Sequence, residues 1–148
     1  MWFIDWIMKR NKQCGVPTGR LKILVVSRSI GDRFFLEQLG ERHHWDLWFT
    51  ESPGDGFKLA ARGHFDLILC DRDQPGYPWR EVMDRLVSSA PRSCILLLSA
   101  VNEDYLWGDV LQRGGYNVLL RPLREKAVLC SIDAAVHFIS PEAQFCSR

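Results

Sequence analysis

Three residues that could act on a phosphate or a cation each follow a short apolar run of this chain. Asp71 follows the run 67–70, Ser99 follows a second run, and Arg121 follows a third. A carboxylate can ligate a hard cation, and a guanidinium holds the oxygens of a carboxylate or phosphate. Each run is bounded by turn signals, which is typical of a strand buried on both faces. We therefore expect the three side chains at one edge of a sheet, whereas a plain turn-capping role is the alternative for Asp71.

Strand-like and helical patterns alternate from residue 21 to residue 138. The predicted strands are 21–26, 45–49, 67–70, 94–98 and 116–120. The predicted helices are 30–40, 52–62, 79–90, 102–113 (or 103–113) and 123–138. Five such units predict an α/β fold, a doubly wound five-stranded parallel sheet with right-handed crossovers and helices on both faces. The most apolar strands, which contain Ile23, Leu67 and Ile95, are expected at its centre.

Two helices carry clear local signals. In helix 30–40 we expect an inward face formed by Ile30, Phe34, Phe35 and Leu39, with Gly40 as the end of the helix. Helix 52–62 should begin at Ser52, which is a favoured N-cap residue and is followed by proline.

Composition excludes several function classes. The chain has 148 residues and a net charge of +1, so it offers no electrostatic case for binding nucleic acid. Its five cysteines form no C-x-x-C pair, which argues for a reducing, cytoplasmic compartment and against zinc. His43 and His44 are adjacent but lack metal-ligand spacing to any cysteine, so no metal role is expected for them.

Residues 1–20 stand apart from the rest of the chain. Trp2, Trp6 and Lys9 fall at helical spacing within an apolar stretch that is too short to span a bilayer. We interpret 1–20 as an N-terminal helix and linker, 21–139 as the folded domain and 140–148 as a tail. The helix could pack on the domain or on another copy of it. A partner-docking helix, or a membrane-interface anchor formed by residues 1–12, are the alternatives.

Three segments together resemble the receiver domain of bacterial response regulators, the chemotaxis-protein-like family. They are Asp-Leu-Ile-Leu-Cys-Asp with its following Pro-Gly (66–76), Leu-Leu-Leu-Ser-Ala (96–100) and Leu-Leu-Arg-Pro-Leu (119–123). The resemblance covers residues 21 to about 139 and implies strand order 2-1-3-4-5. It also implies a place in two-component signal transduction. Only about ten residues follow residue 138, so we expect no DNA-binding or output domain there.

The resemblance implies a chemistry and a set of site residues. In the family, a histidine kinase donates a phosphoryl group to an aspartate with the help of Mg²⁺. Asp71 matches the phospho-acceptor, and Ser99 matches the hydroxyl that holds the phosphoryl group, with Ala100 as its small neighbour. Asp73 lies where the family uses a main-chain carbonyl as a metal ligand. Pro122 matches a proline that is often cis in the family.

Three positions depart from the family's pattern. Ser27 and Arg28 replace the acidic pair that holds the metal. Arg121 replaces the lysine that binds the phosphoryl group, and arginine is bulkier and forks two donors. Val118 replaces the aromatic residue that repacks in the switch. Tyr116, two residues earlier, is expected on the same face of its strand but one pleat away.

From these departures we expect Arg28 and Arg121 to converge on Asp71 and to neutralise it without a metal. This predicts a degenerate receiver (a pseudo-receiver). It would be neither an enzyme nor a cofactor protein, and it would act through protein contacts. Its partner would be a histidine kinase, a phosphotransfer protein or a downstream effector, and a homodimer is a further option.

Two other functions stay open from the sequence. One is a functional phospho-acceptor in a phosphorelay, which would use Mg²⁺ held by Asp71 and Asp73. The other is a flavodoxin-like protein that binds a small molecule or anion at the turn 27–32, which offers two serines, an arginine and a glycine before a helix. The family's usual interaction face would present five side chains here, namely Tyr105, Trp107, Gln112, Tyr116 and Arg124.

Overall fold

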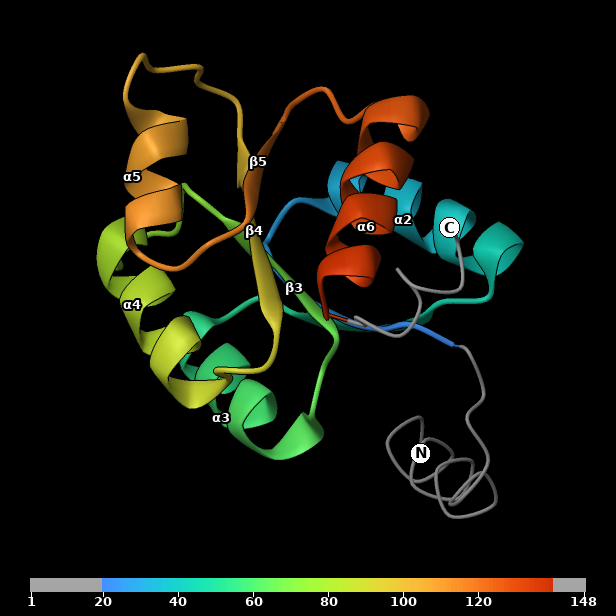
Figure 1. Cartoon of the computed structure of the whole chain (residues 1–148), viewed down its shortest axis with the longest axis horizontal. Coiled ribbons are helices and arrows are strands. Elements are labelled where there is room, and N and C mark those ends of the chain that lie inside the picture. Colours follow the sequence, from blue (N-terminus) through green and yellow to red (C-terminus); the bar gives the residue numbers. More distant parts are fainter. Residues whose placement is uncertain (1–19, 140–148) are drawn as a thin grey trace.

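The computed structural model describes residues 20–139 (Figure 1). Its strands are β1 (Lys22–Val26), β2 (Asp46–Thr50), β3 (Leu67–Asp71), β4 (Cys94–Ser99) and β5 (Asn117–Leu120). Its helices are α2 (Ile30–His43), α3 (Pro53–Gly63), α4 (Trp79–Ser89), α5 (Leu106–Gln112) and α6 (Glu125–Ile139). The predicted N-terminal helix and C-terminal tail lie outside the described residues.

The five strands form one parallel sheet in the order β2-β1-β3-β4-β5, so the predicted fold class and strand order are confirmed. Each strand is joined to the next through a helix, which returns the chain to the end of the sheet where the parallel strands begin. Every residue of β1, β3 and β4 is buried, which confirms the prediction that the most apolar strands are central.

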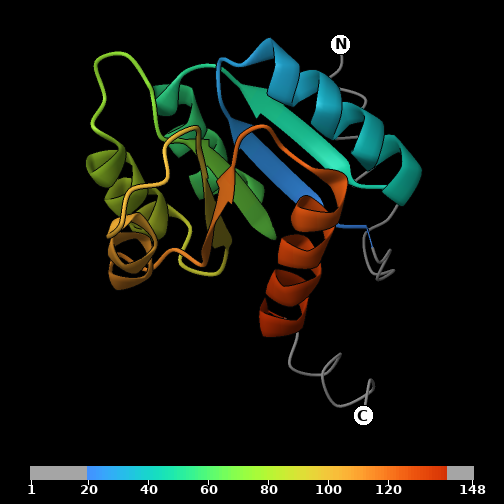
Figure 2. The same cartoon turned by 90° about the horizontal axis from the view of Figure 1, so that it is seen from above.

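Helices cover both faces of the sheet. Figure 1 shows α3, α4 and α5 on one side and α2 and α6 on the other, and Figure 2 shows the twist of the strands between them. Two apolar clusters follow from this layering. One joins alternate strand residues such as Leu24 and Ile68 to α3, α4 and α5, and the other joins residues such as Val25 and Leu69 to α2 and α6. The period-2 alternation of each central strand therefore supplies both cores.

Helix α2 differs from the prediction in its buried face and its end. Ile30 is 82% exposed and Phe34 is 62% exposed, whereas Leu36 and Leu39 are fully buried, so the predicted inward face was wrong for its first two residues. The helix continues past Gly40, where a Cβ would collide with the side chain of Leu47. It ends instead at a left-handed residue, His44. Gly40 thus serves close packing of α2 on β2 rather than termination.

Other helix boundaries shift by a few residues. Ser52 caps α3 as predicted, with its side chain accepting a hydrogen bond from the N–H of Asp55. Helix α5 begins at Leu106 rather than at 102, because the preceding residues 100–105 form an exposed connection after β4. Among the described residues no helix is long and apolar enough to cross a bilayer.

Candidate functional site

The carboxyl ends of β1, β3 and β5 bring the site residues together at one edge of the sheet. Ser27 follows β1, Asp71 is the last residue of β3, and Arg121 follows β5. Parallel strands place their carboxyl ends at the same edge, where chemistry gathers in open α/β sheets. The strand-end position predicted for Asp71 is therefore confirmed, and the side chains of Asp71 and Arg121 are in contact.

Asp71 is buried and fully hydrogen-bonded. It is 6% exposed. Its Oδ1 accepts from the main-chain N–H of Asp73 (3.0 Å) and from Arg121 Nη1 (3.2 Å). Its Oδ2 accepts from the hydroxyl of Ser27 (3.0 Å) and lies 2.8 Å from Arg121 Nη2. Burying a carboxylate costs free energy unless the group is paired and hydrogen-bonded. These contacts therefore offset the cost of burying Asp71.

Arg121 joins Asp71 to a second buried acid, Asp32. Arg121 Nε donates to Asp32 Oδ2 at 2.7 Å. Arg121 Nη2 lies 2.7 Å from Asp32 Oδ2 and 2.8 Å from Asp71 Oδ2, but it is not aligned for a hydrogen bond with either oxygen. Arg121 Nη2 is therefore attracted to the two carboxylates by opposite charge at short distance, without a hydrogen bond. One guanidinium neutralises two carboxylates that would otherwise repel each other in a buried setting.

The contacts of Arg121 also fix its charge. Burial alone would lower the pKa of Arg121, but hydrogen bonds to Asp32 and Asp71 outweigh it and raise the pKa above the usual value of arginine. Behind the site, burial and, to a lesser extent, the negative charge of Asp71 raise the pKa of Cys70 to about 12. Cys70 is therefore a neutral thiol at neutral pH.

Asp32 was missed as a site residue from the sequence. It lies in the first turn of α2, where the side chain of Ser29 caps the helix by accepting from the N–H of Asp32 (3.2 Å). An acidic residue in the first turn of a helix usually interacts favourably with the helix dipole. That ordinary role gave no reason to pair Asp32 with Arg121, which lies 89 residues further along the chain. A usable signal was the absence of the acidic pair after β1, since Asp32 is the next carboxylate in the chain.

The expected convergence of Arg28 on Asp71 is not found. Arg28 is exposed, and within residues 20–139 it forms no hydrogen bond or ion pair with Asp71. The hydroxyl of Ser27 donates to Asp71 and accepts from the N–H of Ser29 (3.1 Å), which closes the turn after β1 and leaves Arg28 at the surface. Among the residues that the structure describes, Arg121 alone supplies the counter-charge of Asp71.

The Ser99 hydroxyl binds its own loop rather than Asp71. Its Oγ donates to the carbonyl of Val101 (2.7 Å) and accepts from the N–H of Val101 (3.0 Å). Ser99 is fully buried, whereas Ala100 is exposed. The Arg121–Pro122 peptide bond is cis, and the N–H of Arg121 donates to the carbonyl of Ser99 (2.8 Å). This hydrogen bond joins the backbone of Arg121, just after β5, to the last residue of β4.

The loop after β3 is held by a separate charge pair. Arg72 binds Asp73 (3.0 Å) and Glu103 (2.6 Å), so it links the loop after β3 to the loop after β4. Gln74 is buried and donates to the carbonyl of Val26 (2.9 Å), which fixes the same loop to β1. The Asp73 side chain is thus exposed and committed to Arg72, away from Asp71.

Tyr116 and Val118 lie on different sides of the sheet. Val118 packs with the cluster of α3, α4 and α5, whereas Tyr116 packs with the cluster of α2 and α6. The expectation of a shared face was wrong because β5 begins only at Asn117, so strand alternation does not extend back to Tyr116.

The donor set does not fit Mg²⁺. Magnesium requires near-octahedral oxygen ligands and usually carboxylate charge. Both oxygens of Asp71 are engaged by hydrogen bonds, and a guanidinium lies between Asp71 and Asp32. Within residues 20–139 no group of three acidic, histidine or cysteine residues could hold a metal ion. The cationic role at this edge is filled by Arg121.

No protein-family model matches the sequence, and no curated protein matches it. Solved structures do match. A receiver domain of a putative Luxo repressor protein from Vibrio parahaemolyticus is 18% identical, with a TM-score of 0.76, covering 85% of this chain and 97% of that one. A CheY-like receiver domain protein from Methanospirillum hungatei is 16% identical, with a TM-score of 0.76 and coverages of 83% and 98%. The chemotaxis protein CheY4 of Vibrio cholerae is 18% identical, with a TM-score of 0.71 and coverages of 78% and 98%.

These likenesses span nearly the whole of each matched chain. The chain therefore has the receiver fold of CheY-like response regulators.

Proposed function

We propose that this chain is a receiver-type module of two-component signalling that acts through protein contacts and does not undergo Mg²⁺-dependent phosphorylation of Asp71. The observation that carries the proposal is the guanidinium of Arg121 between Asp32 and Asp71, with Arg121 Nη2 at 2.7 and 2.8 Å from their oxygens. A carboxylate that attacks a phosphoryl group must first release an oxygen and tolerate a second anion. Here every Asp71 oxygen has a partner, and Arg121 is already shared.

The energetics favour keeping the ion pairs of Arg121 with Asp32 and Asp71 intact. Removing one member of a buried, hydrogen-bonded ion pair costs about 3–5 kcal/mol, because the remaining charge is left uncompensated. A phosphoryl group on Asp71 would have to compete with Asp32 for Arg121. Asp32 is 7% exposed and lies in the first turn of α2, where its carboxylate contacts the same guanidinium as Asp71. We infer that the three side chains hold the domain in one state.

An ordered aromatic surface supports a role in protein contacts. Trp107 on α5 is 58% exposed. Its indole N–H donates to Asn117 Oδ1 (3.2 Å), and Asn117 Nδ2 donates to Ser131 (3.1 Å) on α6. Tyr105, two residues before Trp107 in the sequence, and Leu120, the last residue of β5, are also exposed. A side chain held in place before binding loses less entropy in a complex, and tryptophan is enriched at interface hot spots. A kinase, phosphotransfer protein or effector is the class of partner proposed.

The turn 27–32 is a poor anion site in this structure. Its Ser27 hydroxyl is engaged by Asp71 and Ser29, and its last residue, Asp32, places a buried carboxylate at the start of α2. A carboxylate at that point repels an anionic ligand. The geometry therefore favours the signalling module over an anion-binding protein of flavodoxin type.

Binding of Mg²⁺ gives a direct test. In calorimetric titration of the full chain with millimolar MgCl₂ at neutral pH, we expect no saturable heat, because the guanidinium of Arg121 fills the cationic position between Asp32 and Asp71. An Asp71→Asn variant serves as the matched control, since it removes the charge and keeps the shape. Saturable Mg²⁺ binding by the natural sequence that disappears in Asp71→Asn would show instead that the metal displaces Arg121.

A further inference from the structure

The outer face of α2 carries two large apolar side chains that are exposed to solvent. Ile30 is 82% exposed and Phe34 is 62% exposed, and they lie about one helical turn apart at the start of the helix. Single exposed apolar residues are common on soluble proteins, whereas neighbouring ones form a patch of the kind found at interaction surfaces. Leu36 and Leu39, which are fully buried, supply the contact of α2 with the sheet. The patch therefore adds nothing to the packing of the domain itself.

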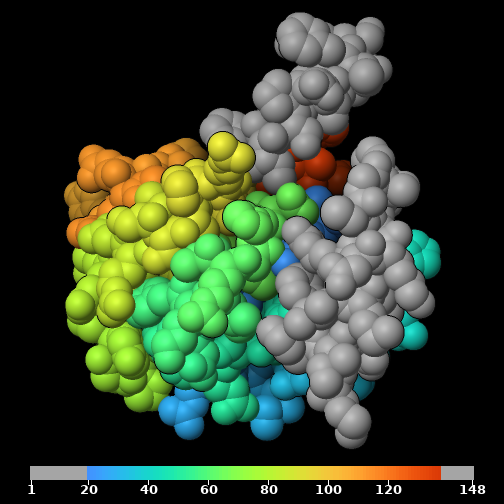
Figure 3. All heavy atoms as spheres, turned by 90° about the horizontal axis from the view of Figure 1, so that it is seen from below, coloured from blue at the N-terminus to red at the C-terminus, as the bar shows by residue number. Residues whose placement is uncertain are grey.

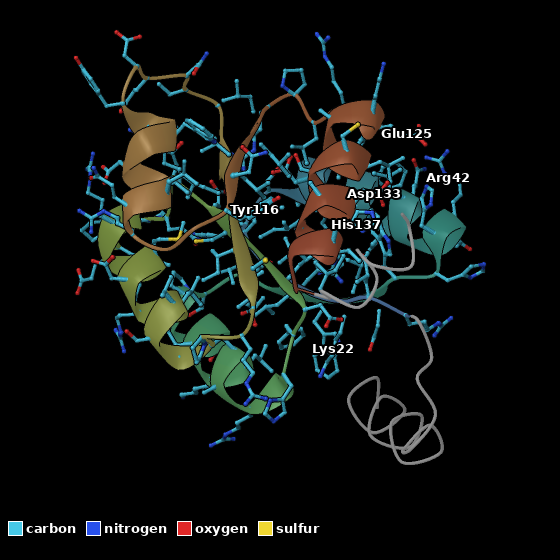
Figure 4. All side chains as sticks on the ribbon, viewed as in Figure 1. Lys22, Arg42, Tyr116, Glu125, Asp133 and His137 are labelled. Atoms are coloured by element: carbon cyan, nitrogen blue, oxygen red, sulfur yellow. The ribbon has the colours of Figure 1, made fainter. Side chains whose placement is uncertain are left out.

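The patch continues along α2 as a stripe of exposed side chains that lie within about 80° of one another around the helix, at about 3.6 residues per turn. The members of this stripe are Ile30, Phe34, Gln38 and Glu41. Other residues of α2 bind neighbours within the domain on either side of the stripe. On one side Arg42 binds Glu125 of α6 at 3.0 Å (Figure 4). On the other, Arg33 binds Glu37 and lies 4.9 Å from the ring centre of Phe49. The stripe itself faces solvent.

The two ends of the stripe carry opposite charges. Arg28 lies two residues before the start of α2, and Glu41 lies in its last turn. Both are exposed, and within residues 20–139 neither side chain forms a hydrogen bond or an ion pair. A cation at the start of a helix and an acid near its end are each disfavoured by the helix dipole. A local arrangement that is unfavourable within one molecule indicates a partner outside it.

The stripe is complementary to a second copy of itself. When two α2 helices pack antiparallel with a two-fold axis at Phe34, this ring meets its own copy, and Ile30 meets the aliphatic part of the partner's Gln38. Arg28 lies six residues before Phe34, and Glu41 lies seven residues after it. Both are therefore about 10 Å from the axis, at about 1.5 Å per residue, so Arg28 of each copy faces Glu41 of the other. A parallel pair would instead bring like charges together.

We propose that the chain forms a symmetric dimer through α2, with Phe34 on the two-fold axis and two ion pairs that join Arg28 of one copy to Glu41 of the other. This arrangement gives Arg28 an acidic partner other than Asp71, and it buries the apolar residues of α2 that lie outside the core. Within the described chain, none of the three interface residues forms a hydrogen bond or ion pair with Asp71 or Arg121. The dimer therefore goes beyond the function proposed above and can fail without affecting it.

Sedimentation velocity of the full chain tests the dimer, over about 1 µM to about 1 mM, a range that suits a small interface. We expect the sedimentation coefficient to rise with concentration from that of a monomer to that of a dimer. Phe34→Ala should weaken the dimer by about tenfold or more, because each dimer loses two buried rings. Tyr105→Ala is the matched control and should leave the dimer unchanged. Tyr105 is 86% exposed and directly precedes α5, which covers the other side of the sheet (Figure 1).

Charge reversal tests the antiparallel arrangement. Arg28→Glu and Glu41→Arg should each weaken the dimer by about tenfold, because each places two like-charged pairs at the interface. An equal mixture of the two single variants should regain association, since one copy of each brings opposite charges together at both ends. The double variant Arg28→Glu/Glu41→Arg should dimerise as the natural sequence does. Lys58→Glu is the matched control and should change nothing. Lys58 is exposed on α3, which with α4 covers another face of the molecule (Figure 3, blue-green to yellow-green).

Three outcomes would overturn the proposal. The first is a monomer at every concentration, which would leave the stripe to a different protein. The second is an unchanged dimer in Phe34→Ala, or an equal loss of association in Tyr105→Ala, which would place the interface on another surface. The third is failure of both the mixture and the double variant to regain association, which would exclude the pairing of Arg28 with Glu41. Circular dichroism checks the fold of each variant, and no unfolding is expected because every substituted side chain is exposed.

Discussion

Replacing Arg121 by alanine is expected to lower the free energy of unfolding by about 3–5 kcal/mol at neutral pH. The substitution leaves two carboxylates, Asp32 and Asp71, buried at 7% and 6% exposure without the cation that both contact. Their mutual repulsion and the loss of hydrogen bonds to the guanidinium act in the same direction. Urea denaturation followed by circular dichroism measures the change, because it reports the midpoint and the slope separately.

Two companion variants distinguish this account from a general loss of packing. Arg124→Ala removes an exposed arginine three residues further along the chain and should change stability by less than about 0.5 kcal/mol. Asp32→Asn in the Arg121→Ala background removes one of the two stranded charges and should recover part of the loss. A cost below about 1 kcal/mol for Arg121→Ala, or no recovery in the double variant, would contradict the shared ion pair.

Ile68→Ala is expected to cost about 3 kcal/mol, within a usual range of about 2–5 kcal/mol for large-to-alanine changes in a core. Ile68 is fully buried on the central strand β3, where it pairs with Leu24 on β1 and Ile95 on β4. The cavity would open beneath the strand that carries Asp71. The same denaturation experiment measures it, with Leu120→Ala as control. Leu120 is 43% exposed at the sheet edge and should cost less than about 1 kcal/mol. A similar loss of unfolding free energy in Ile68→Ala and Leu120→Ala would show that Ile68 does not lie in the core.

The sheet could be predicted from the sequence because its signals are local and redundant. Each central strand is a short apolar run that ends at a polar residue, and this pattern survives errors of one or two residues at the boundaries. The same pattern placed Asp71 at the correct edge. Helix α2 was harder, because Ile30 and Phe34 are apolar and at helical spacing yet lie in solvent. Hydrophobicity alone does not show which of two overlapping faces a helix buries.

Only part of the candidate site could be predicted from the sequence. The pairing of Arg121 with Asp71 follows from two strand ends at the same edge, and it is observed. The contribution of Asp32 depends on the direction of a side chain in the first turn of α2, and Arg28 reaches the surface because Ser27 closes the preceding turn. The Ser27–Asp71 and Arg121–Asp32 contacts depend on side-chain orientation across 44 and 89 residues of sequence separation, which neither spacing nor periodicity encodes.

The central claim is that Arg121, shared by Asp32 and Asp71, has taken the place of the metal. Intact-mass measurement after incubation with acetyl phosphate and Mg²⁺ tests it most directly. A receiver domain that retains the acidic pair and the lysine, treated in parallel, shows that the reagent is active. The account predicts no gain in mass for this chain, with or without Mg²⁺. A Mg²⁺-dependent gain of one phosphoryl group that is lost in Asp71→Asn would contradict it, and would make the chain a functional phospho-acceptor.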